Sequence, residues 1–193
     1  MSTKFQQIKV YNLTKKYNKD YVFKDLNTTI TNEKINLLIG YNGKGKSTFL
    51  KIILNLISYE GIIEKTFKSV AYCPDKIKLP DFIKVKEFIE LIKLNIEKAN
   101  YLIDEFKIDI NKRIDQLSKG MKQKLILIQC LSKDAEAYFF DEPLNGLDDE
   151  AIKIFKGEVL SLHKKNKMII IVTHLIKTFS DLPFTVIDLE SDK

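Results

Sequence analysis

The chain has 193 residues, which suits one domain, or one domain with a small insertion. Its residues are 45% hydrophobic and 30% charged, enough to bury a core beneath a charged surface. The longest apolar run, residues 168–172, is far too short to cross a bilayer, and the N-terminus has no apolar signal core. We therefore expect a cytoplasmic protein, unless a partner holds it at a membrane.

The net charge of +6 does not by itself indicate a nucleic-acid partner. The positive residues are lysines scattered among Glu and Asp, with Arg113 as the one arginine. A nucleic-acid surface would show a more clustered basic patch, so we expect no nucleic acid. Cys73 and Cys130 lie in apolar surroundings, where cysteines more often pack as small apolar groups than form a bridge or a metal site. A reducing compartment fits this pattern.

The first part of the chain predicts short strands and then a strand, a glycine-rich turn and a helix. Residues 35–39 are mostly apolar and β-branched at their ends, as in a buried strand. Pro74 should end a later strand. The predicted elements are strands at residues 8–11, 22–23, 26–30, 35–39 and 70–73, and a helix at 46–57.

Residues 76–117 behave differently from the rest of the chain. Val85, Phe88, Ile89 and Ile92 recur at helical spacing, which predicts a small helical insertion. Beyond it, apolar strands alternate with helices, and this predicts an α/β fold with a mostly parallel sheet covered on both faces. The predicted elements are helices near 119–132 and 149–163 and strands at 137–140, 168–172 and near 184–189.

The turn within "LLIGYNGKGKSTFL", residues 37–50, fits the P-loop pattern G-x-x-x-x-G-K-[ST]. Glycines let the backbone curl closely around a phosphate, and the N–H groups of the turn and of the following helix form an anion site. A chance match is the alternative, but the strand and helix that the motif requires are both predicted here. The matching residues are Gly40, Gly45, Lys46 and Ser47.

The P-loop predicts a nucleoside triphosphate site. Lys46 would reach the β- and γ-phosphates, and the Ser47 hydroxyl would bind Mg²⁺. Thr48 follows on the helix, where its hydroxyl can also bond locally. The motif alone leaves kinases, GTPases, helicases and transport ATPases open.

A second motif, "AYFFDEP" at residues 137–143, is an apolar strand that ends in two carboxylates. Asp141 suits a role in holding Mg²⁺, and Glu142 can orient and deprotonate the attacking water. Phosphoryl transfer needs mainly such positioning and charge neutralisation. A helix N-cap beside a surface acid is the alternative.

A third motif, "QLSKGMKQKL" at residues 116–125, is a polar turn that opens a helix. Ser118 and Gly120 place a hydroxyl and a bare backbone at the helix N-terminus, which can bind an anion. The alternative is that Ser118 is a plain N-cap.

With these motifs in order, the chain resembles the nucleotide-binding subunits of ATP-binding cassette (ABC) transporters over essentially its whole length. "GYNGKGKST" resembles the Walker A motif, "LSKGMKQKL" the LSGGQ signature with Lys119 in place of a glycine, and "YFFDEP" the Walker B motif with its catalytic Glu. "LNGLD" at 144–148 resembles the D-loop, and "IIIVTH" ends in the switch histidine, His174.

The resemblance implies a single ABC ATPase domain over 1–193. It would contain a RecA-like core at about 1–75 and 133–193, a small N-terminal antiparallel β-subdomain and a helical subdomain at about 76–132. Asn42, Gly43 and Lys44 of the P-loop would also bind the nucleotide. His174 would contact the γ-phosphate, although a lone His after an apolar strand is often a structural residue.

Two further positions follow from the resemblance. Tyr17 sits where the family has an aromatic that stacks on adenine, although Tyr11 and Tyr21 are close alternatives. Asp75, in "AYCPD", replaces the glutamine that normally contacts Mg²⁺ and senses the membrane partner. We therefore expect Asp75 at the metal together with Ser47 and Asp141.

The function implied is an ATPase subunit, with ATP and Mg²⁺, that pairs with itself or with another ABC ATPase subunit and drives a separate membrane permease. "SKGMKQ" and the acid at the glutamine position favour an exporter over an importer. The alternative is a soluble ABC-type ATPase without a transport role, as in iron–sulphur cluster assembly. We also expect some of the side chains of Phe82, Ile83 and Val85, within residues 73–90, to form one wall of a groove for a permease helix. Packing of all three against the helical insertion is the other interpretation.

Overall fold

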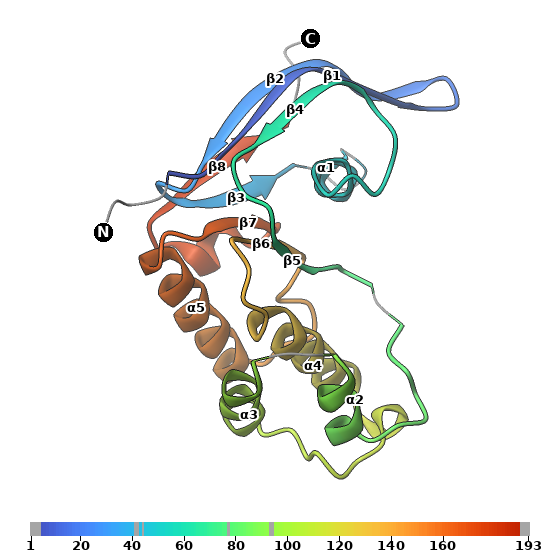
Figure 1. Ribbon diagram of the computed structural model, residues 1–193, viewed down its shortest axis with the longest axis vertical. Helices are drawn as coiled ribbons and strands as arrows, with labels where there is room; N and C mark the ends of the chain where they lie inside the picture. The colour runs from blue at the N-terminus through green and yellow to red at the C-terminus, as the bar shows by residue number, and fades with distance from the viewer. Residues whose placement is uncertain (1–4, 41–42, 44, 77, 93–94, 190–193) are drawn as a thin grey trace.

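The computed structural model describes residues 5–40, 43, 45–76, 78–92 and 95–189. Its centre is a parallel sheet of five strands in the order β5-β6-β7-β3-β8 (Figure 1). Every residue of β6 and of β7 is buried, as expected for strands covered on both faces. The strands are β3 (Ile35–Ile39), β5 (Val70–Cys73), β6 (Ala137–Asp141), β7 (Met168–Val172) and β8 (Phe184–Asp188).

A smaller antiparallel sheet of three strands lies beside the parallel sheet, in the order β2-β1-β4. β1 (Gln7–Tyr17) and β2 (Asp20–Thr31) form a hairpin much longer than the short strands predicted. β4 (Glu60–Lys65) was not predicted at all, because its mostly exposed residues show no apolar alternation. Pairing with β1 defines this strand instead.

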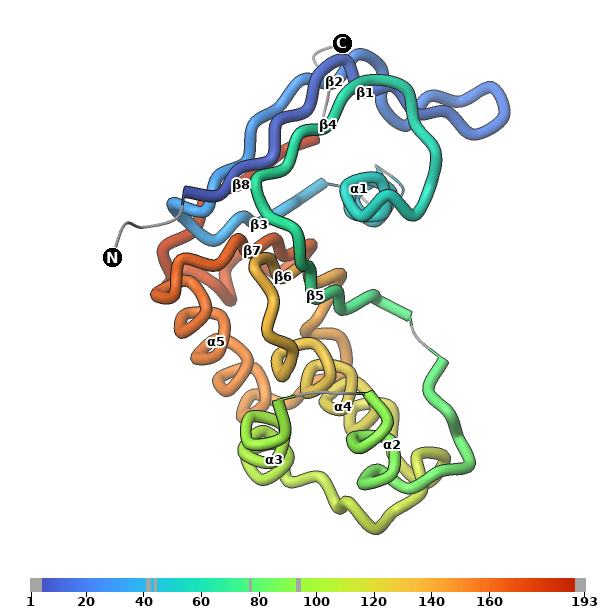
Figure 2. The backbone as a smooth tube through the Cα atoms, viewed as in Figure 1, coloured from blue at the N-terminus to red at the C-terminus, as the bar shows by residue number. Residues whose placement is uncertain are grey.

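Helices cover both faces of the parallel sheet. α1 (Lys46–Ile53) lies on the same side as the antiparallel sheet, and the remaining α-helices lie on the other side (Figures 1 and 2). These helices are α2 (Val85–Leu91), α3 (Ile96–Glu105), α4 (Lys119–Leu131) and α5 (Asp149–Lys164), with short 3₁₀ turns at Ile114–Gln116 and Ile176–Phe179.

The helix predicted at 46–57 ends earlier, at Ile53. Asn55 has a left-handed backbone with φ 57°, which closes the helix. The Lys65 ammonium on β4 donates to the Ile53 carbonyl at 2.5 Å and so satisfies an acceptor at the helix end. The early end frees the chain to turn into β4.

Alternation along the strands divides the core into two hydrophobic clusters, one on each face of the parallel sheet. On β6, Phe140 packs edge-on against Phe155 of α5, with ring centroids 5.1 Å apart. The next residue back, Phe139, meets Phe67 on the opposite face at 6.0 Å. The predicted α/β class, with a parallel sheet and a small antiparallel sheet, is confirmed.

The helices after β5 share one cluster with the parallel sheet. The division into a core at about 1–75 and 133–193 and a helical subdomain at about 76–132 therefore stays a prediction. Cys73 and Cys130 are free and buried, as expected. Among the described residues, no helix has the length and apolar character needed to span a bilayer.

Candidate functional site

The P-loop leads from the end of β3 into α1, as its sequence predicts. Gly45, immediately before the helix, has φ 86°, and a Cβ there would lie 2.3 Å from the Val22 Cγ1 atom of β2. The turn therefore requires glycine for its backbone angle and for its packing against β2. Lys46 is buried, and its ammonium donates to the Gly40 carbonyl at 2.7 Å, across the turn. Asn42 and Lys44 lie outside the described residues.

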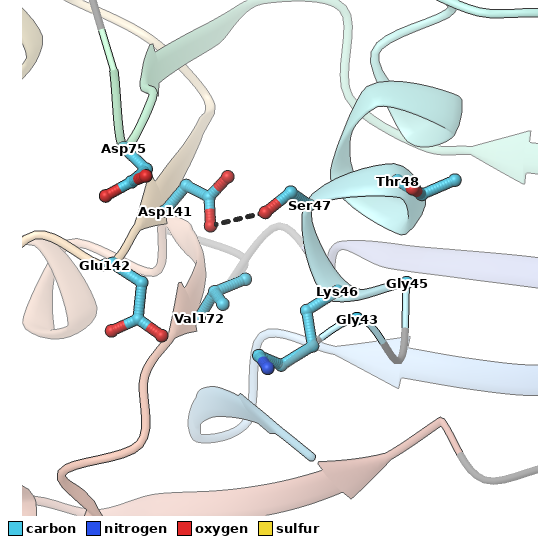
Figure 3. A pocket seen from close by; sticks show the side chains of 9 residues that line it. All are labelled: Gly43, Gly45, Lys46, Ser47, Thr48, Asp75, Asp141, Glu142 and Val172. Atoms are coloured by element: carbon cyan, nitrogen blue, oxygen red, sulfur yellow. Dashed lines mark hydrogen bonds between the residues drawn. The ribbon is translucent and has the colours of Figure 1, made fainter. Parts of the chain in front are cut away.

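The P-loop and the end of β6 enclose one cavity of about 260 Å³ (Figure 3). This cavity brings together most of the P-loop residues with all three acidic residues predicted from the sequence. It is lined by Gly43, Gly45, Lys46, Ser47, Thr48, Asp75, Asp141, Glu142 and Val172.

Asp141 and Ser47 both line the cavity and contact each other. The Ser47 hydroxyl donates to Asp141 Oδ1 at 3.0 Å (Figure 3). Asp141 is 2% exposed, and burial raises the pKa of its carboxyl, with the bond from Ser47 opposing the shift. The negative charge of Asp75 raises this pKa further. A desolvated carboxylate beside a hydroxyl and a second carboxylate is a site that favours a cation.

These oxygen donors fit Mg²⁺, which prefers carboxylates, hydroxyls and phosphate oxygens. No group of three or more His, Cys, Asp or Glu side chains within the described ranges could enclose a metal by itself. Ser47, Asp141 and Asp75 would therefore hold the ion together with oxygens of a bound phosphate. A cation there would neutralise charge on the phosphates.

Glu142 lines the cavity and contacts His174, which is not among the lining residues. His174 Nδ1 lies 3.0 Å from Glu142 Oε2. Glu142 has φ 49°, an unusual backbone for a glutamate, and its N–H donates to the Val172 carbonyl at 3.0 Å. Burial raises the pKa of the Glu142 carboxyl, and the neighbouring His174 opposes this. A carboxyl with raised pKa, held by the contact with His174, suits a base that accepts a proton from water.

The predicted signature residues lie apart from this cavity. Ser118 is the N-cap of α4, and its hydroxyl accepts from the Met121 N–H at 3.2 Å. A Cβ on Gly120 would lie 2.6 Å from the Gly146 carbonyl oxygen, so this glycine allows close packing of α4 on the loop after β6. Neither Ser118 nor Gly120 lines the cavity.

Tyr17 is at the end of β1, next to the hairpin turn. Its ring is half exposed, and the Lys15 ammonium lies 4.9 Å from the ring centroid. Tyr11 and Tyr21 are exposed as well. Stacking of Tyr17 on adenine therefore stays a prediction.

The structure adds two residues that sequence reasoning missed. Val172 lines the cavity beside Glu142, although the sequence shows it only as one apolar residue among several. Asn145 donates its side-chain amide to Asp75 Oδ1 at 3.2 Å. Its place in "LNGLD" was the one signal that could have drawn attention to it.

Of the three side chains considered for a groove, Val85 is fully buried as the first residue of α2 and cannot contribute to it. Ile83 packs against the core. Phe82 alone of the three is strongly exposed, at 84%, with the Arg113 guanidinium 5.8 Å from its ring. Helix packing thus accounts for two of these side chains.

Known proteins are similar to this chain in sequence and in fold. A family model described as ABC transporter matches residues 23–145. An uncharacterized ABC transporter ATP-binding protein of Methanocaldococcus jannaschii is 30% identical, over 97% of this chain and 75% of its own length. A cytochrome c biogenesis ATP-binding export protein of Reclinomonas americana is 31% identical, over 89% and 86%. A zinc import ATP-binding protein of Rickettsia conorii is 32% identical, over 86% and 76%.

Solved structures show the same similarity. An ATP-binding subunit of an ABC transporter has a TM-score of 0.84 at 25% identity, covering 94% of this chain and 86% of that one. A dimeric ATP-binding cassette bound to ADP and phosphate has the same fold, with a TM-score of 0.79 at 20% identity, over 96% and 97%. The chain belongs to the ABC transporter family, as one of its ATP-binding subunits with ATPase activity.

Proposed function

We propose that this ATPase subunit drives a separate membrane permease by closing, in a dimer, around two ATP molecules. The observation that carries the proposal is the separation of two groups of residues. Lys46, Ser47, Asp141 and Glu142 line one cavity, whereas Ser118 at the start of α4 does not. A second subunit is what would bring a signature residue to the phosphates.

Within each cavity, the buried Lys46 would bind the β- and γ-phosphates. Ser47 and Asp141, already joined by a hydrogen bond, would hold Mg²⁺. Glu142 would accept a proton from the attacking water, and His174 would hold Glu142 in place and contact the γ-phosphate. Tyr17 would stack on adenine from the hairpin.

The permease would keep the protein at the inner face of the cell membrane. Phe82 is the residue that we expect to meet it, because its side chain is strongly exposed and aromatic residues are enriched at protein interfaces. The short irregular segment around Phe82 joins β5, which ends beside the cavity, to α2. A permease helix bound there would be connected directly to the nucleotide site.

The direction of transport is proposed to be export. The support is the "SKGMKQ" signature and Asp75 at the position where the family has glutamine. The relatives include both an export protein and a zinc import protein, so they favour neither direction.

A mixing experiment tests the shared site. Ser118→Arg damages the signature, and Lys46→Ala damages the phosphate site. In a mixed dimer of these variants, one composite site has both defects and the other has none. ATPase activity of the mixture should therefore clearly exceed that of either variant alone.

The mixed dimers must first be shown to form, for example by pulling down one tagged variant and detecting the other. Absence of any rescue in such dimers would contradict a site shared between subunits. Mixing each variant with itself, under a different tag, provides the matched control.

A further inference from the structure

The side-chain contact between Asp75 and Asn145 joins two segments that are distant in the sequence. Asn145 Nδ2 donates to Asp75 Oδ1 at 3.2 Å. Asp75 follows β5 and precedes the helices, whereas Asn145 belongs to the loop between β6 and α5. Neither the phosphate-binding pattern nor the fold requires this contact.

The loop that carries Asn145 is held in place by α4. The Gln123 amide on α4 donates to the Pro143 carbonyl at 3.2 Å. The Gly146 carbonyl, on the other side of Asn145, packs closely against Gly120. A Cβ on Gly120 would not fit beside it. The Asn145 N–H also closes a turn onto the Glu142 carbonyl at 3.3 Å. The Asn145 amide is therefore presented from a fixed backbone.

Asp75, by contrast, lies in an irregular segment after β5, without a helix or strand to orient it. Its carboxylate nevertheless lines the cavity beside Asp141 and Glu142 (Figure 3). A carboxylate has two oxygens, and the bond from Asn145 engages Oδ1. Oδ2 remains available to a cation in the cavity.

We infer that Asn145 is a positioning residue that orients the Asp75 carboxylate toward the divalent cation bound with ATP. The inference rests on the proposed function, since it requires that metal and ATP bind together in this cavity. Hydrogen bonds to metal-binding carboxylates fix their orientation, and their loss typically weakens metal binding by about 10- to 100-fold. Asn145 also connects the metal site to α4, whose first turn carries the signature.

The test measures how much Mn²⁺ strengthens nucleotide binding. The affinity of a fluorescent, non-hydrolysable ATP analogue is compared in Mn²⁺ and in EDTA, and the ratio of the affinities gives the contribution of the metal. Asn145→Ala removes the donor. Asp75→Asn keeps an oxygen that accepts the bond from Asn145 but removes the negative charge.

Asn145→Ala should lower the ratio by about 10-fold while the affinity in EDTA stays unchanged, and Asp75→Asn should lower the ratio at least as much. The double variant should be no weaker than Asp75→Asn alone, because Asn145 acts through Asp75. An unchanged ratio for Asn145→Ala, or additive losses in the double variant, would overturn the inference. Asn111→Ala, at an exposed asparagine in the helical region, is the matched control, with the melting temperature measured for all variants.

A different result would concern the proposed function itself. If the wild-type chain bound the analogue with the same affinity in Mn²⁺ and in EDTA, or did not bind it, the cavity would not be a metal–ATP site. Both the inference and the site proposal would then fail together. Normal metal dependence in the wild type with an unaffected Asn145 variant would remove the inference alone.

Discussion

His174 Nδ1 and Glu142 Oε2 are 3.0 Å apart, although their residues follow two different strands. β6 and β7 are parallel neighbours in which Asp141 pairs with Val172, so both loops begin at the same edge of the sheet. Glu142 has a left-handed backbone, with φ 49°. Such a conformation typically costs about 1–3 kcal/mol and is retained at functional sites.

Glu142→Gln should abolish ATP turnover while ATP binding is retained. The amide preserves the shape of the side chain but cannot accept a proton from water. With ATP present, the variant should accumulate as a dimer, which size-exclusion chromatography would detect. Retention of most of the wild-type ATPase rate would exclude Glu142 from the mechanism.

Lys46→Ala should weaken nucleotide binding itself. Removal of a charge-assisted contact to phosphate costs about 1.5–3 kcal/mol, and this variant also loses the bond to the Gly40 carbonyl. Titration with a fluorescent ATP analogue measures the change in affinity. Lys164→Ala, at an exposed lysine near the end of α5, is the control and should bind normally. Unchanged affinity for Lys46→Ala would contradict the P-loop assignment.

Most of the residues that the sequence singled out in the P-loop and after the apolar strand line one cavity, for a physical reason. The strand, glycine turn, lysine and helix of the P-loop are consecutive, so their chemistry and spacing are visible in one segment. Asp141 is the last residue of the otherwise apolar strand β6 and Glu142 follows it, which places both carboxylates at the edge of a parallel sheet. A local sequence pattern was sufficient to single out the residues of both segments.

The features that the sequence did not reveal depend on distant contacts. β4 is a strand because β1 lies beside it, and its own residues are mostly exposed. Asn145 is placed opposite Asp75 by the packing of α4 on the loop after β6. Val85 lies among lysines, and the helical insertion buries it completely. The first two relationships have no periodic pattern, whereas Val85 belongs to the helical spacing that predicts the insertion.

Asp148 at the start of α5 offers a test of stability against pH. Its carboxylate accepts from the Ala151 N–H at 2.8 Å and pairs with the Lys124 ammonium at 2.6 Å. These two contacts hold the pKa of Asp148 below its ordinary value, the bond from Lys124 most strongly. A lowered pKa in the folded state means that the stabilisation is complete above the unfolded-state pKa, and is lost as the pH falls through the folded-state pKa.

Asp148→Asn keeps the N-cap but loses the charge. It should be slightly less stable than the wild type at neutral pH, and the difference should shrink between about pH 5 and pH 3. Asp148→Ala also loses the cap and should cost about 1 kcal/mol. Urea unfolding at several pH values measures the free energy of unfolding of both variants and of the wild type. If the stability difference between the Asp148→Asn variant and the wild type does not change with pH, the ion-pair explanation is wrong.

Phe82→Asp should weaken binding to the permease without affecting folding or ATP binding. Phe82 is 84% exposed, so a polar residue there removes little buried area, and surface substitutions usually change stability by less than about 0.5 kcal/mol. The measurement is co-purification with the permease from detergent-solubilised membranes, with the melting temperature recorded in parallel. Ile62→Asp is the matched control, since Ile62 is an exposed apolar residue on β4, in the antiparallel sheet. If the Phe82 variant is well folded and still co-purifies normally, the permease binds elsewhere.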